Sequence, residues 1–220
     1  MKKVKLKYKK EIVDSNIFFN YDIKVFIQHC ILLVLIYKKQ IGVESMNGDI
    51  KIRKVNQTDA IKWFKFVNKV WRSAYMNIFP EEVFLEKEKN VEEKERNFNK
   101  KICNDNRNIA LVAEYKGEIV GIMCGSINSS YEYFNLEYAD LICLYIDPNF
   151  QKKGIGSNFK KMFEDWARKN GASKYVIGVL KDNQKARAVY EKWGGKLSVY
   201  EESFYKMGVA YKEVFYIYEL

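Results

Sequence analysis

The sequence predicts an α/β fold in which helices flank a mixed β-sheet. Three observations lead to this prediction. Residues 141–146 form an unbroken apolar run, which is typical of a strand covered on both faces. Apolar side chains between Phe159 and Trp166 then recur at the i, i+3, i+4 and i+7 spacing of an amphipathic helix. Two further apolar runs meet at Lys116 and Gly117, a good two-residue turn for a β-hairpin.

The first half of the expected domain begins with one strand and two helices. Residues 49–55 alternate as a short strand, and Thr58 and Asp59 supply a cap for the helix that follows. A second helix is expected to start at Pro80, with acidic residues near its positive end, and to continue through residues 86–101. The hairpin comes next, and a tyrosine-containing loop then leads into the central strand.

After the central strand, helices and strands alternate to the end of the chain. The amphipathic helix closes at Gly171, which supplies C-cap chemistry. Residues 175–180 are expected to form the next strand, and residues 183–193 another helix. The last two strands, at about residues 196–204 and 209–218, turn back on each other.

A glycine loop joins the central strand to the amphipathic helix, with the sequence Gln151-Lys152-Lys153-Gly154-Ile155-Gly156. Glycine lacks a Cβ, so its backbone approaches a ligand closely and adopts a positive φ. A loop that enters a helix N-terminus points free N–H groups and the positive end of the helix dipole at one spot, which suits a phosphate. The alternative is a plain strand-to-helix turn in which the glycines serve packing. The two common nucleotide-binding motifs, G-x-x-x-x-G-K-[ST] and G-x-G-x-x-G, are absent.

The charge, the histidine and the cysteines exclude other classes of protein. The net charge is +10, but residues 1–45 hold nine lysines against four acids, which leaves 29 basic and 24 acidic residues elsewhere. This surplus is modest, and no basic run is interleaved with aromatics, so we expect no nucleic-acid partner. The only histidine is His29, so a zinc site or a His-based triad in the main domain is not expected. Four cysteines without C-x-x-C spacing predict reduced, mostly buried thiols in a cytoplasmic protein, namely Cys30, Cys103, Cys124 and Cys143.

Residues 1–45 are an N-terminal extension outside this pattern. Residues 1–10 are dense in lysine and residues 25–37 are mostly apolar, but this run is shorter than the ~20 residues of a membrane-spanning helix. It also lacks the cleavage pattern of a secretory signal. Three alternatives stay open: a non-native or incidental extension, a segment that binds an interface or a partner, and a segment docked on the sheet edge. We place the functional domain in residues 46–220, because every expected element begins after Met46.

The order of these pieces resembles the GNAT superfamily of acetyl-CoA-dependent N-acetyltransferases. The resemblance lies in L-Y-I-D-P-x-x-Q-x-x-G-I-G, a helix, Y-V-I-G-V, and N-x-x-A-x-x-V-Y-x-x-x-G-G, and it covers roughly residues 50–220. It implies a GNAT-like fold, with a mixed, mostly antiparallel sheet, a splayed parallel central strand pair and flanking helices. It also implies acetyl-CoA as cosubstrate, a small-molecule or peptide amine as acceptor, direct transfer between them, no membrane partner, and a monomer or homodimer.

The resemblance also assigns the residues of coenzyme binding. The backbone N–H groups of the glycine loop, with Ser157 at the helix start, hold the pyrophosphate. The backbone of the central strand bonds the pantetheine amides like an added strand. Asn183 opens the last helix at a position where the family contacts coenzyme, although Asn is also a common N-cap. The residues implied are Leu144, Tyr145, Ile146, Gln151, Lys152, Lys153, Gly154, Ile155, Gly156, Ser157, Asn183 and Tyr190.

Acetyl transfer to an amine needs a base for the ammonium proton and an acid for the leaving thiolate. By resemblance the acid is Tyr190, seven residues after Asn183 on nearly the same helix face, and its alternative role is a core aromatic. Asp140 is the candidate base, because many relatives carry Glu at this position. Glu137 is a second candidate, and the alternative for Asp140 is an acid that caps a strand entry. The motif departs from the family at Gly195, where Phe is usual.

A signature of the form W-x-x-x-Y-x-x-x-x-P, found at the acceptor wall of many small members, is matched by Trp71, Tyr75 and Pro80, with Phe79 beside them. Helical core aromatics explain Trp71 and Tyr75 equally well, so the acceptor does not follow from them. A coenzyme-A-binding sensor or pseudoenzyme with the same fold is the alternative function, and a basic nucleic-acid-binding module is a third. Binding of acetyl-CoA and release of free thiol across a panel of amines separate the three.

Overall fold

The computed structural model describes residues 44–46, 50–89, 91–98, 102, 105–134 and 137–220. The chain divides into two units between Ile41 and Gly42, and every described residue belongs to the second unit. The predictions for residues 1–43, among them those for His29 and Cys30, lie outside the described residues, as does the prediction for Cys103.

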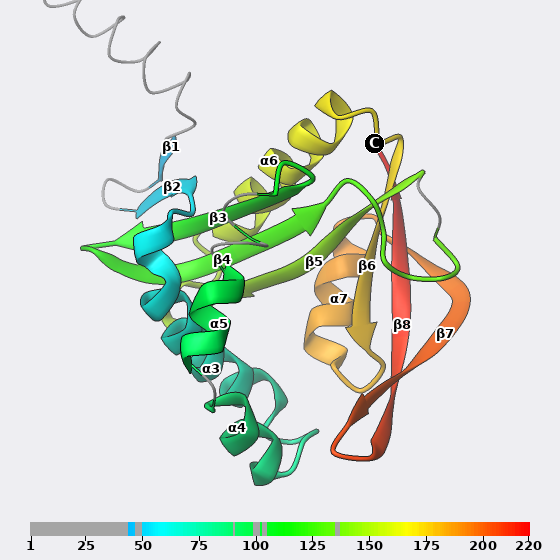
Figure 1. Ribbon diagram of the computed structural model, residues 1–220. Helices are drawn as coiled ribbons and strands as arrows, with labels where there is room; N and C mark the ends of the chain where they lie inside the picture. The colour runs from blue at the N-terminus through cyan, green and yellow to red at the C-terminus, as the bar shows by residue number, and fades with distance from the viewer. Residues whose placement is uncertain (1–43, 47–49, 90, 99–101, 103–104, 135–136) are drawn as a thin grey trace, which may run out of the picture. The chain divides into compact units, whose positions relative to one another are not determined.

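The described residues form one eight-stranded β-sheet with the strand order β1-β2-β3-β4-β5-β6-β8-β7 (Figure 1). Every neighbouring pair in it is antiparallel except β5 with β6, which is parallel. The strands are β1 (Glu44–Met46), β2 (Ile50–Lys54), β3 (Asn108–Tyr115), β4 (Glu118–Ser126), β5 (Tyr138–Ile146), β6 (Lys174–Leu180), β7 (Lys196–Lys206) and β8 (Val209–Glu219). The predicted mixed, mostly antiparallel sheet is confirmed.

The two parallel strands separate soon after they meet. β5 pairs with β6 only from Tyr138 to Asp140, and beyond that point β5 keeps β4 as its partner while β6 keeps β8. One extra residue of β5 between Asp140 and Cys143 makes a bulge against β4, and Ile142 within it is 55% exposed. Figure 1 shows the two strands diverging, which confirms the predicted splayed central pair.

Helices cover both faces of the sheet. They are α3 (Ala60–Tyr75), α4 (Glu81–Lys87), α5 (Val91–Phe98), α6 (Ile155–Lys169) and α7 (Gln184–Lys192), with the 3-10 turns η1 (Gln57–Asp59) and η3 (Pro148–Phe150). On one face, α6 buries Phe159 and Phe163 in a core that it shares with the sheet. On the other face, α3 buries Trp63 and Phe66 in a second core. Because the central strands are covered on both sides, their sequences are almost continuously apolar.

The predicted second helix is divided in the structure. α4 begins after Pro80 as expected, but it is short and α5 is a separate helix, so the prediction of one helix through residue 101 is wrong. The reason lies in packing. Phe84 of α4 joins a cluster that includes Leu180 of β6, whereas Phe98 of α5 packs against α3 in a different core. Each of the two helices therefore packs in a different core.

The start of the first helix is capped one turn earlier than predicted. The side chain of Asn56 accepts a hydrogen bond from the Thr58 N–H at 2.9 Å. The carboxylate of Asp59 accepts one from the Asn56 N–H at 2.9 Å, which completes a capping box around η1. Asp59 is the N-cap residue of α3, as predicted, but the capping side chain at the start of η1 is that of Asn56 rather than Thr58.

Both predicted hairpin turns are present. Lys116 and Gly117 have φ values of 50° and 81°, and Met207 and Gly208 have φ values of 48° and 80°. Two consecutive positive φ values are the signature of the tight turn whose twist matches that of the flanking strands. The second turn fixes the register of β7 against β8, and this register places Glu202 opposite Glu213.

Candidate active site

The glycine loop ends in a helix N-terminus with free donors. Gly154 is the N-cap of α6 and has a φ of 82°, in the left-handed region that glycine adopts readily. The first hydrogen bond of this helix runs from the Asn158 N–H to the Gly154 carbonyl, 3.1 Å apart, so the N–H groups of residues 155–157 precede it. The N-cap supplies no side-chain hydrogen bond to them. The loop thus enters a helix N-terminus as the sequence predicted, and the binding of a phosphate by these N–H groups stays a prediction.

The other loop residues divide between surface charge and packing. Lys152 and Lys153 are exposed immediately before the helix start. Gly156 lies inside the helix, where an added Cβ would come within 3.3 Å of both Ile146 and Trp193. Glycine therefore serves packing at this position, which is the alternative that the sequence left open, whereas the N-cap glycine serves backbone conformation.

The edge of β5 that faces β6 offers backbone groups to a ligand. Leu144 and Ile146 pack toward the α6 core and Tyr145 packs into the α3 core, so these side chains lie on the two faces of the strand. In the part of the chain that the structure describes, no strand pairs with this edge beyond Asp140. Gln151 of the glycine loop donates from Nε2 to the Ile146 carbonyl at 3.3 Å. This edge matches a ligand that adds to β5 like a strand, and its contact with coenzyme stays a prediction.

Three tyrosines from separate elements approach one another beside this edge, and we call Tyr75, Tyr145 and Tyr190 the phenol cluster. The hydroxyl oxygens of Tyr75 and Tyr145 are 3.5 Å apart, and the indole N–H of Trp71 donates to the Tyr145 hydroxyl at 3.0 Å. Burial, and after it the charge of the neighbouring phenols, raises the pKa of Tyr145 and of Tyr190. The phenols therefore keep their protons at neutral pH.

α7 brings Asn183 and Tyr190 to this cluster. The Asn183 Oδ1 accepts from the Ala186 N–H at 3.2 Å, so the cap role is present, and its side chain also hydrogen-bonds the Tyr75 hydroxyl. Tyr190 is partly exposed and packs beside Trp193, with 6.0 Å between the ring centroids. The ring of Tyr190 thus has the packing role of a core aromatic, while its hydroxyl is a protonated group next to the β5 edge.

The aromatic residues of the acceptor-wall signature pack together between α3 and α4. The ring of Phe79 is stacked on that of Trp71, with 5.8 Å between centroids. The Nζ of Lys87 lies 4.0 Å from the centroid of the Trp71 ring, and burial together with two neighbouring lysines lowers the pKa of Lys87 to about 8. This packing accounts for the aromatic signature without identifying an acceptor.

Asp140 is buried where β5 and β6 separate. The residue is 2% exposed, and its Oδ1 has no hydrogen-bond partner among the described residues. Burial, reinforced by the charge of Glu213, raises the pKa of Asp140 to about 7, and a hydrogen bond from the Ser130 backbone opposes the shift. A base with a pKa near the working pH is efficient in proton transfer. Glu137, the second candidate, is exposed immediately before β5.

Two glutamates and a tyrosine that the sequence analysis missed lie with Asp140. The Tyr131 hydroxyl donates to the Oε1 of Glu213 at 3.4 Å, and Glu202 lies opposite Glu213 in the ladder of β7 and β8. Burial raises the pKa of Glu213, the Tyr131 hydrogen bond opposes this, and the charge of Glu202 adds to it. We call Asp140, Glu202 and Glu213 the acidic cluster. The sequence of the turn between β7 and β8 could have revealed this cluster. The turn sets the register that places Glu202 opposite Glu213, and a like-charged pair of this kind destabilises a sheet.

The two described cysteines face each other across β4 and β5. The Sγ atoms of Cys124 and Cys143 are 2.9 Å apart, and both residues are free thiols of intermediate exposure. The hydrogen bond with Cys143 and the burial of the pair raise the pKa of Cys124. Cys124 is therefore protonated at neutral pH, and both thiols are half-buried, which is less than the mostly buried state that the sequence predicted.

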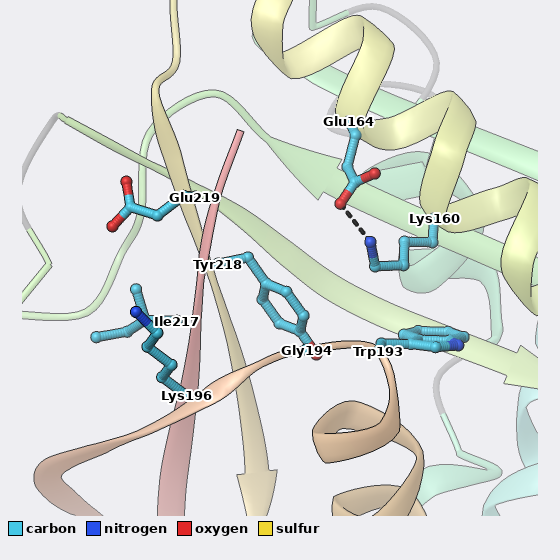
Figure 2. Close-up of a pocket in the computed structure, with 8 residues that line it drawn as sticks. All are labelled: Lys160, Glu164, Trp193, Gly194, Lys196, Ile217, Tyr218 and Glu219. Atoms are coloured by element: carbon cyan, nitrogen blue, oxygen red, sulfur yellow. Dashed lines mark hydrogen bonds and ion pairs between the residues drawn. The ribbon is translucent and has the colours of Figure 1, made fainter.

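A separate hollow of about 280 Å³ lies between α6, the end of α7 and β8 (Figure 2). Lys160 and Glu164 of α6 pair beside it, 2.5 Å apart. None of the predicted site residues lines the hollow, and Trp193 is the neighbour that it shares with Gly156 of the glycine loop. The predicted site and this hollow are thus different features of the molecule.

Two kinds of feature are absent from the residues that the structure describes. No group of three or more described His, Cys, Asp or Glu side chains is arranged to hold a metal ion. No described helix combines the length and the apolar character that crossing a membrane requires.

A family model described as the acetyltransferase (GNAT) family matches residues 68–195 of this chain. The matched segment is more than half of the chain and contains β5, the glycine loop, α6, β6 and α7. The elements that build the site are thus the elements that the family model covers.

Solved structures share the fold. One is the PaiA N-acetyltransferase from Thermoplasma acidophilum in complex with coenzyme A, with 21% identity, a TM-score of 0.57, and coverage of 78% of this chain and 99% of that chain. Another is yncA from Salmonella typhimurium with acetyl-CoA, at 17% identity and a TM-score of 0.56, covering 78% and 94%. A ribosomal-protein-alanine N-acetyltransferase from Brucella melitensis has 19% identity and a TM-score of 0.56, covering 77% and 99%.

Proposed function

The chain belongs to the GNAT acetyltransferase family, and we propose that it transfers the acetyl group of acetyl-CoA directly to a primary amine of a small molecule or peptide. The observation that carries this proposal is a pair of proton-transfer groups beside the diverging strands. Tyr190 supplies a phenol that is protonated at neutral pH and interacts with Tyr75 and with Cys143 of β5. Asp140 supplies a carboxyl with a pKa of about 7 at the point where β5 and β6 separate.

Acetyl-CoA is the donor. Family membership supports this, as do the coenzyme A and acetyl-CoA in two of the solved structures with this fold. The N–H groups at the start of α6 suit the pyrophosphate, and the free edge of β5 suits the pantetheine amides. The residues proposed to contact the coenzyme are Leu144, Tyr145, Ile146, Gln151, Lys152, Lys153, Gly154, Ile155, Gly156, Ser157, Asn183 and Tyr190.

The proposed reaction is a direct displacement. Asp140 takes a proton from the acceptor ammonium, and the resulting amine nitrogen attacks the thioester carbonyl carbon. A C–N bond forms, the C–S bond breaks, and Tyr190 gives its proton to the departing thiolate. The nitrogen loses a second proton as the amide forms, and this proton restores the Tyr190 phenol. Asp140 returns to the carboxylate by releasing its proton to water. Holding the amine against the thioester makes a covalent enzyme intermediate unnecessary.

Release of free thiol from acetyl-CoA with a panel of primary amines tests this function, with the amide identified by mass spectrometry. We expect acetyl-CoA to raise the melting temperature, because a ligand that binds the folded state stabilises it by mass action. We also expect one thiol for each amide formed. Stabilisation without any amide would favour the coenzyme-binding sensor instead, and the absence of both effects would contradict the donor.

We also propose that this activity resides in the domain of residues 46–220. The matched family segment lies inside this range. β1 begins at Glu44 and pairs with β2, so the expectation that every element begins after Met46 is wrong for this strand, and the sheet edge includes two residues before Met46. A shortened chain that keeps β1 is therefore the appropriate one for testing the boundary.

A further inference from the structure

The acidic cluster gathers side chains from three strands of the sheet. Asp140 belongs to β5, Glu202 to β7 and Glu213 to β8. Tyr131, from the loop before β5, hydrogen-bonds Glu213 beside Gly178 of β6. A Cβ at position 178 would come within 2.3 Å of the Tyr131 hydroxyl and 2.7 Å of the Glu213 Oε1. Glycine at this position is therefore what lets the two polar groups converge over the sheet.

The carboxylates of the cluster lack a positive partner in the described protein. The Oδ1 of Asp140 and the Oε1 of Glu202 are buried without a hydrogen-bond partner among the described residues, and Asp140 as a whole is 2% exposed. None of the ion pairs found between described residues involves Asp140, Glu202 or Glu213. A buried carboxylate without compensation is costly. The chain as a whole has a net charge of +10, so this negative excess is local to the site.

The acidic cluster adjoins the phenol cluster. Burial is the main cause of the raised pKa of Tyr75, and the charge of Glu213 contributes to it. The Tyr75 hydroxyl lies 3.5 Å from that of Tyr145, and Tyr75 also contributes to the raised pKa of Tyr190. The carboxylates are therefore neighbours of the groups assigned to proton transfer.

An acceptor with a single positive charge does not account for three carboxylates. The reacting amine gives its proton to Asp140 and is then neutral, which leaves Glu202 and Glu213 opposite each other without a counter-charge. A like-charged cross-strand pair destabilises a sheet unless a cation offsets it. The three carboxyl groups come from three different strands, β5, β7 and β8, and an organic cation with two charged groups can meet two of them at once.

We propose that the acceptor is a diamine or polyamine, with its reacting amine at Asp140 and a second ammonium group held by Glu202 and Glu213. Tyr131 positions Glu213 through its hydrogen bond, and Gly178 makes room for both side chains. This inference rests on the proposed function and specifies its acceptor.

Matched acceptors test the inference in the unmodified protein. Rates with 1-aminobutane, 1,4-diaminobutane and a triamine of the same spacing are compared at one ionic strength, because salt screens charge. We expect kcat/KM for the diamine and the triamine to exceed that for the monoamine by about tenfold or more. Equal values, or a higher value for the monoamine, would overturn the inference.

Glu213→Gln and Glu202→Gln remove a charge with little change of shape. Each is expected to raise KM for the diamine about tenfold with a smaller effect on kcat, and so to reduce the preference over the monoamine. The matched control is Glu201→Gln, since Glu201 is the exposed neighbour of Glu202 and pairs with Lys181 at 2.6 Å. An unchanged preference in Glu201→Gln supports the site, whereas an equal loss in all three variants would overturn it.

Calorimetric titration of the diamine into the protein without acetyl-CoA separates this inference from the proposed function. Diamine binding that Glu213→Gln weakens about tenfold, with acetyl-CoA affinity retained, supports the acidic cluster as the site. If no amine yields an amide while such binding persists, the proposed function alone is contradicted. If amides form equally from monoamines and diamines and the diamine does not bind, the inference alone is overturned.

Discussion

The donor side and the acceptor side of this site are built in different ways. The proposed donor side is backbone from one short stretch of chain, consisting of the edge of β5 at residues 141–146 and the start of α6 at residues 155–157. The proposed acceptor side consists of side chains from separate segments, with Tyr131, Glu202 and Glu213 gathered near Asp140. One side thus depends on local conformation, and the other depends on the register of distant strands.

The two sides also differ in how strongly they depend on residue type. Backbone N–H and C=O groups are the same in almost every residue, so the donor side constrains residue type mainly at its glycines. Side chains on the acceptor side can change without changing the backbone, and function in a widely used fold resides in such grafted sites. We therefore expect substitutions on the proposed acceptor side to change acceptor specificity, and substitutions at the glycines of the proposed donor side to change acetyl-CoA binding.

The largest expected effect is the loss of turnover when Tyr190 can no longer donate a proton. Tyr190→Phe is expected to lower kcat by about 10²–10⁴-fold, the usual loss for a positioned acid, while acetyl-CoA affinity is retained. The ring keeps its packing beside Trp193, so only the proton is lost. Steady-state kinetics with calorimetry measure both quantities, and Val189→Ala, at the exposed neighbouring position, is the control. Wild-type turnover would leave Tyr190 with a packing role only.

On the acceptor side, Asp140→Asn is expected to lower the rate at neutral pH by about 10²-fold. The wild-type rate should rise as the pH passes through about 7, because the deprotonated carboxylate of Asp140 is the base. The variant lacks this rise, and its rate should recover only at higher pH, where the amine loses its proton without help. If rate profiles from pH 5 to pH 10 are the same for both proteins, Asp140 is not the base.

The same substitution is expected to change the pH dependence of stability. The pKa of Asp140 in the folded protein, about 7, lies above its ordinary value of 3.8 because of burial, so the folded state binds this proton more tightly than the unfolded state. Stability from this group is fully present below about pH 4 and is lost as the pH rises toward 7. Asp140→Asn should therefore gain in free energy of unfolding relative to the wild type between these pH values. Urea titrations at both ends measure this, and a constant difference would contradict it.

The donor side is tested with two glycines that flank the same helix. Gly154→Val forces a branched side chain into a φ of 82° and is expected to weaken acetyl-CoA binding by about tenfold or more. Gly171→Val imposes the same kind of strain at the other end of α6, where φ is 89°, but away from the loop. Calorimetry on both variants separates the two causes. Equal weakening would show that helix stability, rather than the loop, controls binding.

The smallest effect is expected for the removal of residues 1–41, which belong to neither the donor side nor the acceptor side. Removal of residues 1–41 keeps β1 in the sheet and should leave the melting temperature, the oligomeric state and acetyl-CoA turnover unchanged. Thermal melts, light scattering and thiol release measure the three. A marked fall in any of them would place part of the working protein before Gly42, and would favour a docked extension over an incidental one.

Sequence alone predicted the elements that make up the proposed donor side, because their signals are local. The apolar run of β5, the glycine at position 154 and the stripe of α6 lie within about thirty residues, and each has its own propensity or spacing rule. The break between α4 and α5 was missed because it follows from Phe98 packing into the α3 core, which no local pattern records. The contact between Tyr131 and Glu213 was missed for the same reason, since 82 positions separate the two residues.

The central claim is that the donor binds to backbone at the β5 edge and the start of α6. Titration of acetyl-CoA into nitrogen-15-labelled protein, followed through the amide chemical shifts, tests this claim directly. We predict that the largest shifts occur at residues 141–146 and 151–157, with smaller shifts at Glu202 and Glu213. The largest shifts at the hollow beside Lys160 and Glu164, with little change in the glycine loop, would contradict it.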